Sequence, residues 1–320
     1  MALRAGWIGS IGLIFLIFAN TGAPFSPAQE AQAPLFRSET HLIDFTFSVR
    51  RADGTLAKGL TRDDFQITED GAPQRIAFFG SQGELPLSLG LIVDASNSQS
   101  KFFKRHRKDI EAFLKLVVRP RDQVFAICFG NHLRLTNAMT SSTEEVMQGL
   151  ERFARGDRRF PELAEDDREG GTALYDAIFY SINDQLVRSE GHQRALILFT
   201  DGEENASAHD LLDAIDAARE HDTLLYAIRY TDEKERKTPN ARKGIASLHH
   251  LASETGGSDF DALHTQIREA FSQIAAELRS LYSVAYHSTN SRRDGAFHKV
   301  VITTSDPLLR VQARTGYYAR

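Results

Sequence analysis

The sequence has 320 residues, which at roughly 150 residues per domain predicts about two domains. Hydrophobic residues make up 42% and charged residues 25%, the balance of a globular chain, so global disorder is excluded. The formal net charge of -5, from 38 Lys and Arg against 43 Asp and Glu, lacks the basic excess of a general nucleic-acid binder. The single cysteine, Cys128, lies in an apolar run and is expected to be a buried free thiol.

Residues 1–28 have the layout of a secretory signal peptide. Arg4 precedes an apolar stretch from Trp7 to Ala19, and small and helix-breaking residues follow it. The stretch is short for a membrane span, and the small residues before Gln29 place the cut near Ala28. We therefore expect an exported protein, which is periplasmic, envelope-associated or secreted. A membrane would be contacted only through this segment, as an uncleaved anchor.

Two segments, residues 29–84 and 282–320, alternate apolar and polar residues in the manner of short antiparallel strands. The alternation is clearest from Leu42 to Val49 in the first and from Val300 to Thr303 in the second, with Asp-Gly turn signals between strands. Each segment is too small to bury a core alone. We therefore predict that the two pair with each other into one small β-sandwich.

Residues 85–281, between these segments, alternate apolar runs with helical stripes. Four continuous apolar runs are typical of strands buried on both faces of a parallel sheet: Leu87–Val93, Val124–Phe129, Ala195–Thr200 and Leu224–Ile228. Apolar residues at helical spacing predict helices over Phe103–Val117, Leu174–Leu186 and Leu211–Ala218, with two more at Ile245–Glu254 and Leu263–Leu281. The pattern predicts an α/β domain with a doubly wound, mainly parallel sheet, inserted in the sandwich.

Oxygen-bearing side chains gather in three loops of this predicted domain. The first strand runs into Asp94, Ser96 and Ser98, and the third runs into Asp201. Thr172 lies in a Gly-Gly-Thr-Ala loop that opens a helix. Ligands of open parallel sheets bind beyond the carboxyl ends of the strands, where these loops lie. Two carboxylates with hydroxyls suit Mg²⁺, with Mn²⁺ or Ca²⁺ as alternatives, and the absence of a His and Cys cluster argues against zinc.

These five residues resemble the metal-ion-dependent adhesion site of the von Willebrand factor A domain family: Asp94-x-Ser96-x-Ser98, then Thr172, then Asp201 in Thr200-Asp201-Gly202. All five positions match, and the resemblance covers roughly residues 85–281. It implies a Rossmann-like domain that binds a protein ligand, whose Asp or Glu carboxylate completes the coordination of a divalent cation. The flanks are similar to a bacterial group of exported proteins related to this family, through the stretch from Leu60 to Gly71 and the tail from Ala313 to Tyr318.

The function we expect is therefore an exported, non-catalytic module for protein binding or cell adhesion. The alternative is a metal-assisted hydrolase that uses the same ion, with Glu203 or Glu204 as the base. No His or Lys motif accompanies these two acids, which disfavours catalysis. Phosphate-binding and dinucleotide-binding glycine motifs are both absent from the sequence.

Two charge clusters have both a structural and a functional interpretation. A basic cluster on the first predicted helix is expected to be a solvated face, with partner binding as the alternative: Lys101, Lys104, Arg105, Arg107 and Lys108. An acidic cluster before the Gly-Gly-Thr loop is expected to be a solvated linker, with attraction of cations or of a basic partner as the alternative: Glu162, Glu165, Asp166, Asp167 and Glu169.

Overall fold

The computed structural model describes residues 42–130, 132–163, 171–290 and 292–319. The predicted signal peptide therefore lies outside the described residues. The strands are β1 (Leu42–Arg51), β2 (Phe65–Glu69), β3 (Ala72–Gln74), β4 (Ile76–Ser81), β5 (Leu87–Asp94), β6 (Gln123–Phe129), β7 (Arg134–Thr140), β8 (Gln193–Thr200), β9 (Thr223–Arg229), β10 (Asp259–Asp261), β11 (Tyr282–His287), β12 (Phe297–Thr304), β13 (Leu309–Ala313) and β14 (Gly316–Tyr318). The α-helices are α1 (Phe103–Val117), α2 (Thr143–Ala154), α3 (Leu174–Tyr180), α4 (Leu211–Glu220), α5 (Pro239–Thr255) and α6 (Ile267–Leu278).

A six-stranded sheet forms the centre of the α/β part, in the order β10-β9-β8-β5-β6-β7. Every pairing in it is parallel except that of β6 with the edge strand β7. All eight residues of β5 are buried, because helices cover both faces of the strand. The doubly wound, mainly parallel sheet predicted from the apolar runs is thus confirmed.

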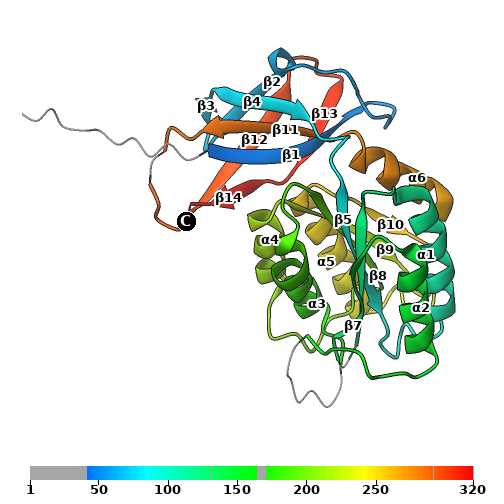
Figure 1. The fold of residues 1–320 in the computed structure, drawn as a ribbon. Coiled ribbons are helices and arrows are strands. Elements are labelled where there is room, and N and C mark those ends of the chain that lie inside the picture. The colour runs from blue at the N-terminus through cyan, green and yellow to red at the C-terminus, as the bar shows by residue number, and fades with distance from the viewer. Residues whose placement is uncertain (1–41, 131, 164–170, 291, 320) are drawn as a thin grey trace, which may run out of the picture. The chain divides into compact units, whose positions relative to one another are not determined.

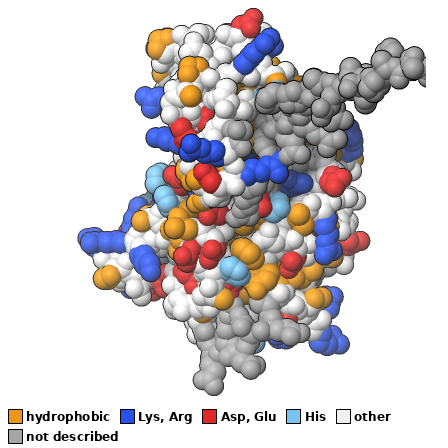
Figure 2. Space-filling model, turned by 90° about the vertical axis from the view of Figure 1, so that its left-hand side faces the viewer, with side chains coloured by type: hydrophobic (Ala, Val, Ile, Leu, Met, Phe, Trp, Pro, Cys, Tyr) orange, Lys and Arg blue, Asp and Glu red, His pale blue; other side chains and the backbone are white. Residues whose placement is uncertain are grey.

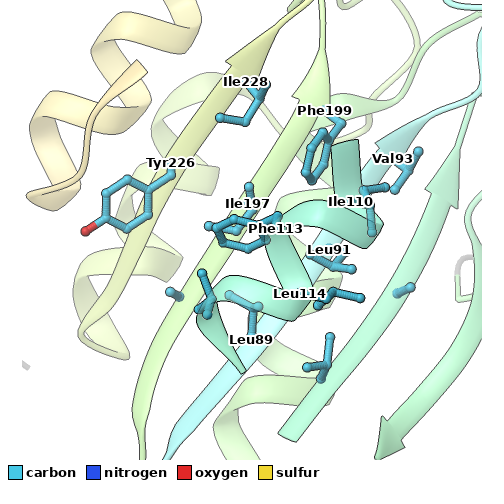
Figure 3. Packing of buried hydrophobic residues seen from close by; sticks show 14 of the residues in the cluster. Leu89, Leu91, Val93, Ile110, Phe113, Leu114, Ile197, Phe199, Tyr226 and Ile228 are labelled. Carbon is cyan, nitrogen blue, oxygen red and sulfur yellow. The ribbon is translucent and has the colours of Figure 1, made fainter. Parts of the chain in front are cut away.

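Helices form two layers, with α1, α2 and α6 on one face of this sheet and α3, α4 and α5 on the other (Figure 1). Figure 3 shows the first layer, where Ile110, Phe113 and Leu114 of α1 lie over apolar side chains of β5, β8 and β9. The three α1 residues are at most 1% exposed. Full burial of such a side chain contributes about 1.5–3 kcal/mol, so this packing fixes α1 and the loop before it on the sheet.

The terminal strands build two antiparallel sheets, β13-β1-β11-β4 and β14-β12-β2-β3. Each sheet combines strands from both ends of the chain, since β1 pairs with β11 and β13, and β2 pairs with β12. Phe47, Phe65 and Tyr282 pack between the sheets with ring centroids 5.1–5.9 Å apart. The predicted pairing of the two terminal segments is therefore confirmed.

The structure differs from the predicted elements at β7, α2, α3 and α6. Sequence patterns missed β7, whose residues are mostly polar and partly exposed as befits an edge strand, and they missed α2. Helix α6 begins at Ile267 rather than Leu263, because the chain first makes β10 and a turn at Asp261. Helix α3 ends at Tyr180 and continues as a π-helical turn, Ser181–Gln185, and a 3₁₀ turn, Leu186–Arg188.

Ion pairs and hydrogen bonds join β1 and the connection between β13 and β14 to the C-terminal ends of three helices. Arg50 of β1 pairs with the fully buried Glu277 of α6 at 2.7 Å. Arg219, near the end of α4, contacts both Glu254 of α5 and the hydroxyl of Thr315. Helices that follow parallel strands end near the amino ends of the strands, so these contacts lie away from the carboxyl ends where the predicted site falls.

Truncation after Leu281 is expected to unfold β1, because both of its neighbours, β11 and β13, follow that residue. Hydrogen exchange followed by mass spectrometry should show amides of β1 losing most of their protection. Strand β8 is the internal control, since its neighbours β5 and β9 remain in the truncated chain. Unchanged exchange in β1 would show that the N-terminal segment folds without the C-terminal one.

Among the described residues, no helix combines the length and apolar character needed to cross a membrane.

Candidate metal centre

Asp94 is the last residue of β5, and its side chain is fully buried. Its two carboxylate oxygens accept different hydrogen bonds. The backbone N–H of Ser96 donates to Oδ1 at 2.9 Å, and the hydroxyl of Thr200 donates to Oδ2 at 2.5 Å. Thr200 is the last residue of the adjacent parallel strand β8, so the pairing of the two strands fixes the orientation of this carboxylate.

A chain of side-chain hydrogen bonds connects the Asp94 loop to Asp201. The hydroxyl oxygens of Ser96 and Ser98 lie 3.1 Å apart, and the Ser98 hydroxyl donates to Asp201 Oδ2 at 2.8 Å. Asp201 follows β8, is 4% exposed, and accepts a further bond from the backbone N–H of Glu203. The structure thus brings together Asp94, Ser96, Ser98 and Asp201 at the carboxyl ends of two neighbouring strands.

Thr172, the fifth predicted residue, is connected to the Asp201 loop through its backbone. Its N–H donates to Asn205 Oδ1 at 2.8 Å, and its carbonyl accepts from the N–H groups of Asn205 and Ala206. Gly171 makes this approach possible: its φ is +113°, and a Cβ there would lie 2.5 Å from the Ala206 Cβ. The loop that presents Thr172 is therefore held against the loop that presents Asp201.

Gly202, directly after Asp201, also permits a close approach of backbone, here between the Asp201 loop and α5. Its φ is +82°, and an added Cβ would lie 2.6 Å from the carbonyl oxygen of Gly244 in α5. A side chain at this position would push α5 away from the strand end. The glycine thus lets the chain turn immediately after Asp201 while α5 packs closely beneath it.

Two nearby carboxylates dominate the electrostatics of this site. Burial, and then the charge of Asp201, raise the pKa of Asp94 to about 7, and hydrogen bonds from Ser96 and Thr200 offset only part of that rise. A cation bound between the carboxylates would remove the cost of ionising both. The donors are all oxygens, as hard divalent cations prefer, and no His or Cys is among the five residues. The set therefore fits Mg²⁺ by charge and by ligand type.

Glu203 and Glu204, the candidate bases for hydrolysis, have different surroundings. Glu204 accepts hydrogen bonds from four backbone N–H groups, those of Leu174, Tyr175, Ala206 and Ser207, and from the Ser207 hydroxyl. It holds the first turn of α3 against the Asp201 loop, a structural role. Glu203 is half-buried, and burial followed by the Asp201 charge raises its pKa.

Gln99 is a residue at this site that no sequence motif indicated. Its side chain is 1% exposed, and its amide Nε2 donates to Asp201 Oδ2 at 2.6 Å and to the carbonyl of Tyr230 at 3.1 Å. These partners are more than a hundred positions away in the chain. No local pattern marks such a contact.

The basic cluster spans the turn before α1 and the first half of that helix, and some of its members pair with acidic neighbours. Lys101 pairs with Asp232 at 2.9 Å and with Glu235, and Arg107 pairs with Glu151. Arg105 donates to the carbonyl of Ala262. These contacts agree with the structural interpretation of the cluster, a solvated helix face whose charges pair with neighbouring groups. Side chains of both signs are also mixed on the face of the described chain seen in Figure 2.

Of the acidic cluster, only Glu162 is described, and it contacts His132 at 2.6 Å and Arg134 at 2.9 Å. Glu165, Asp166, Asp167 and Glu169 lie outside the described residues.

A second group of potential ligand atoms lies in the sandwich, where Glu69, Asp70 and His298 approach one another. Its carboxylates already accept hydrogen bonds. Glu69 accepts from the hydroxyls of Tyr286 at 2.8 Å and Ser288 at 2.7 Å, and Asp70 is 2.7 Å from His298 Nδ1. The two carboxylates therefore already serve as hydrogen-bond acceptors within the sandwich, whereas Asp70 is exposed and Nε2 of His298 has no hydrogen-bond partner among the described residues.

Comparison with known families identifies the α/β part. Residues 89–269 match the model of the von Willebrand factor type A domain. This stretch is more than half of the sequence, and the chain therefore belongs to that family. No curated protein matches the sequence.

Several solved structures are similar to this chain. The conserved hypothetical protein BatB from Bacteroides thetaiotaomicron is 18% identical, with 61% of this chain and 100% of that one covered and a TM-score of 0.47. A von Willebrand factor type A protein from Catenulispora acidiphila is 12% identical, with 88% and 75% covered and a TM-score of 0.45. Proximal thread matrix protein 1 from the mussel byssus, described with a zinc-occupied MIDAS motif, is 15% identical, with 66% and 49% covered and a TM-score of 0.46.

Proposed function

We propose that this protein is an exported binding module that holds Mg²⁺ through Asp94, Ser96, Ser98, Thr172 and Asp201 and takes a carboxylate from a protein ligand. The observation that carries the proposal is the chain of contacts from Asp94 through the two serines to Asp201 at the carboxyl ends of β5 and β8. Von Willebrand factor A domains are typically protein-interaction modules, which supports binding over catalysis. Export is proposed from residues 1–28, which carry the features of a signal peptide.

The chemistry of the five side chains explains why the ligand would be acidic. Two carboxylates formally match the charge of the ion, whereas hydroxyl ligands leave it electrophilic. Mg²⁺ takes six ligands and keeps water where the protein supplies fewer. An Asp or Glu of the partner can replace such a water and adds a charge interaction within a partly dry interface. The bound ion would supply this electrostatic attraction, and the chain would supply its orientation.

Hydrolysis by the same ion is the weaker alternative. A hydrolase needs a base beside the metal-bound water. Glu204 is engaged as the cap of α3, as its five hydrogen bonds show, which leaves Glu203 as the candidate base. Lys243 lines the same cavity as Glu203, but no ion pair joins the two side chains in the described part of the chain. We therefore propose a non-catalytic role.

Selection of random peptides displayed on phage tests this proposal. Peptides captured in Mg²⁺ and released by EDTA should contain Asp or Glu. Replacing that acid by Asn or Gln in a synthetic peptide should weaken binding by about tenfold or more, because a buried charge contact is lost. Peptides that bind equally in Mg²⁺ and EDTA would contradict the proposal.

Thr172→Ala should weaken the Mg²⁺-dependent peptide binding by about tenfold, since removal of one ligand or supporting group commonly costs 10–100-fold. Thr136→Ala is the matched control: Thr136 is also buried, at 4% exposed, but its hydroxyl bonds the carbonyl of Ala126 within the sheet. The control should keep peptide affinity. Fluorescence anisotropy of a labelled peptide measures both variants, and equal losses in the two would remove Thr172 from the site.

A further inference from the structure

Gln99 connects three loops at the carboxyl end of the sheet. It lies in the turn between Ser98 and α1, where its backbone N–H donates to the carbonyl of Ser96 at 3.1 Å. Its side chain crosses to Asp201 after β8 and to Tyr230 after β9. The carbonyl Oε1 has no hydrogen-bond partner in the described part of the chain. The amide is therefore held in the interior by its Nε2 donors alone.

The hydrogen bonds at Asp201 show what these donors do. Oδ2 accepts from both the Ser98 hydroxyl and Gln99 Nε2, and Oδ1 accepts from the Glu203 N–H. An ionised carboxylate has about four acceptor positions, so three are occupied and the remaining one is on Oδ1. Donors from two loops thus fix both the position and the rotation of this carboxylate.

A carboxylate fixed in this way suits some cations better than others. Mg²⁺ is small and demands nearly ideal octahedral geometry, whereas Ca²⁺ accepts six to eight oxygens at longer and more variable distances. A site that holds its oxygens rigidly favours the ion with the stricter geometry. Loss of the Gln99 amide would leave Oδ2 of Asp201 held by the Ser98 hydroxyl alone. The carboxylate would then be oriented less strictly, which Ca²⁺ tolerates better than Mg²⁺ does.

We propose that Gln99 is a positioning residue that orients Asp201 and thereby gives the metal site its preference for Mg²⁺ over Ca²⁺. This inference rests on the proposed function, because it requires that the site bind a divalent cation. In this proposal Gln99 is not itself a ligand of the ion. It acts through Oδ2 of Asp201 and through the carbonyl of Tyr230, which anchors the amide to the end of β9.

Gln99→Met tests the proposal, because methionine keeps the length and buried volume of the side chain and removes both N–H donors. Gln193→Met is a closely matched control. Gln193 is also buried, its Oε1 also lacks a partner, and its Nε2 donates to the carbonyl of Gln82 at the opposite end of β8. Isothermal titration calorimetry of both variants and the wild type with MgCl₂ and with CaCl₂ gives the affinities, and thermal unfolding shows that each variant is folded.

In Gln99→Met we expect the Mg²⁺ affinity to fall by about tenfold and the Ca²⁺ affinity by less than about threefold, in the range measured for residues that support metal ligands. Gln193→Met should leave both affinities unchanged. Should Gln99→Met fail to fold, Gln99→Asn, whose amide is one methylene too short to reach both partners, must show the same change in the Mg²⁺ to Ca²⁺ ratio.

Equal losses for the two ions, or an unchanged ratio, in a folded Gln99 variant would overturn this inference and leave the proposed function intact. A wild-type protein that binds neither ion would overturn both. The two failures are therefore distinguishable in one set of titrations.

Discussion

Asp94→Asn is expected to lose Mg²⁺ binding and at the same time to melt at a higher temperature than the wild type when both are free of metal at pH 8. Binding is lost because one of the two carboxylates that compensate the ion becomes neutral, and we expect at least a hundredfold fall in affinity, near the upper range for loss of such a group. Stability rises because Asp94 is fully buried beside Asp201, and its ionisation without a cation is unfavourable.

Asp122→Asn provides the control for this substitution. Asp122, the residue directly before β6, is 1% exposed and accepts hydrogen bonds from the N–H groups of Leu87 and Arg119. Its carboxylate also forms an ion pair with Arg279. Loss of the Asp122 charge should lower the melting temperature, because the Arg279 guanidinium, whose side chain is 11% exposed, loses its charged partner. The substitution should leave the Mg²⁺ affinity unchanged. Calorimetric titration and thermal unfolding measure both variants. An Asp94→Asn protein with wild-type Mg²⁺ affinity would refute the assignment of the metal centre.

The sequence predicted the parts of the fold whose signals are local. Continuous apolar runs marked β5, β6, β8 and β9 because parallel strands covered by helices bury every residue. Strand β7 was missed, since an edge strand tolerates polar residues such as Asn137 and Thr140. Helix α2 did carry a signal: Ser142 caps it by accepting the N–H of Glu145, and Val146, Leu150 and Phe153 form its buried stripe.

The same distinction applies to the site. Asp94, Ser96 and Ser98 form a local motif, and strand order places Asp201 beside them. The roles of Gln99 and Glu204 depend instead on partners that the fold brings together from other loops. Glu204 follows Asp201 closely in the sequence but turns toward the N-terminus of α3, so its proximity in the chain suggested a base where the structure has a cap.

The ion-free stability of the wild type, compared with that of Asp94→Asn, should decrease as the pH rises from 5 to 8. Because the pKa of Asp94 is raised from 3.8 to about 7 in the folded protein, the folded state binds more protons than the unfolded state between these values. Stability from this group is therefore present at low pH and is lost as the pH rises through about 7. The difference between the two proteins should grow by on the order of 2–4 kcal/mol across this window.

The comparison with Asp94→Asn is needed because His106 acts in the opposite direction. Burial lowers the pKa of His106 to about 3, so the unfolded state takes up a proton there first and the protein loses stability as the pH falls below about 6.5. His106 is common to both proteins, so its contribution cancels in the difference between their stabilities.

Urea unfolding at pH 5, 6, 7 and 8 after removal of metal measures that difference in stability. Saturating Mg²⁺ should abolish the loss of wild-type stability at high pH, because the bound ion stabilises the ionised Asp94 and its binding releases the proton. If the difference in unfolding free energy between the two proteins did not depend on pH, Asp94 would ionise normally in the folded protein. Burial beside Asp201 would then not favour the binding of a cation.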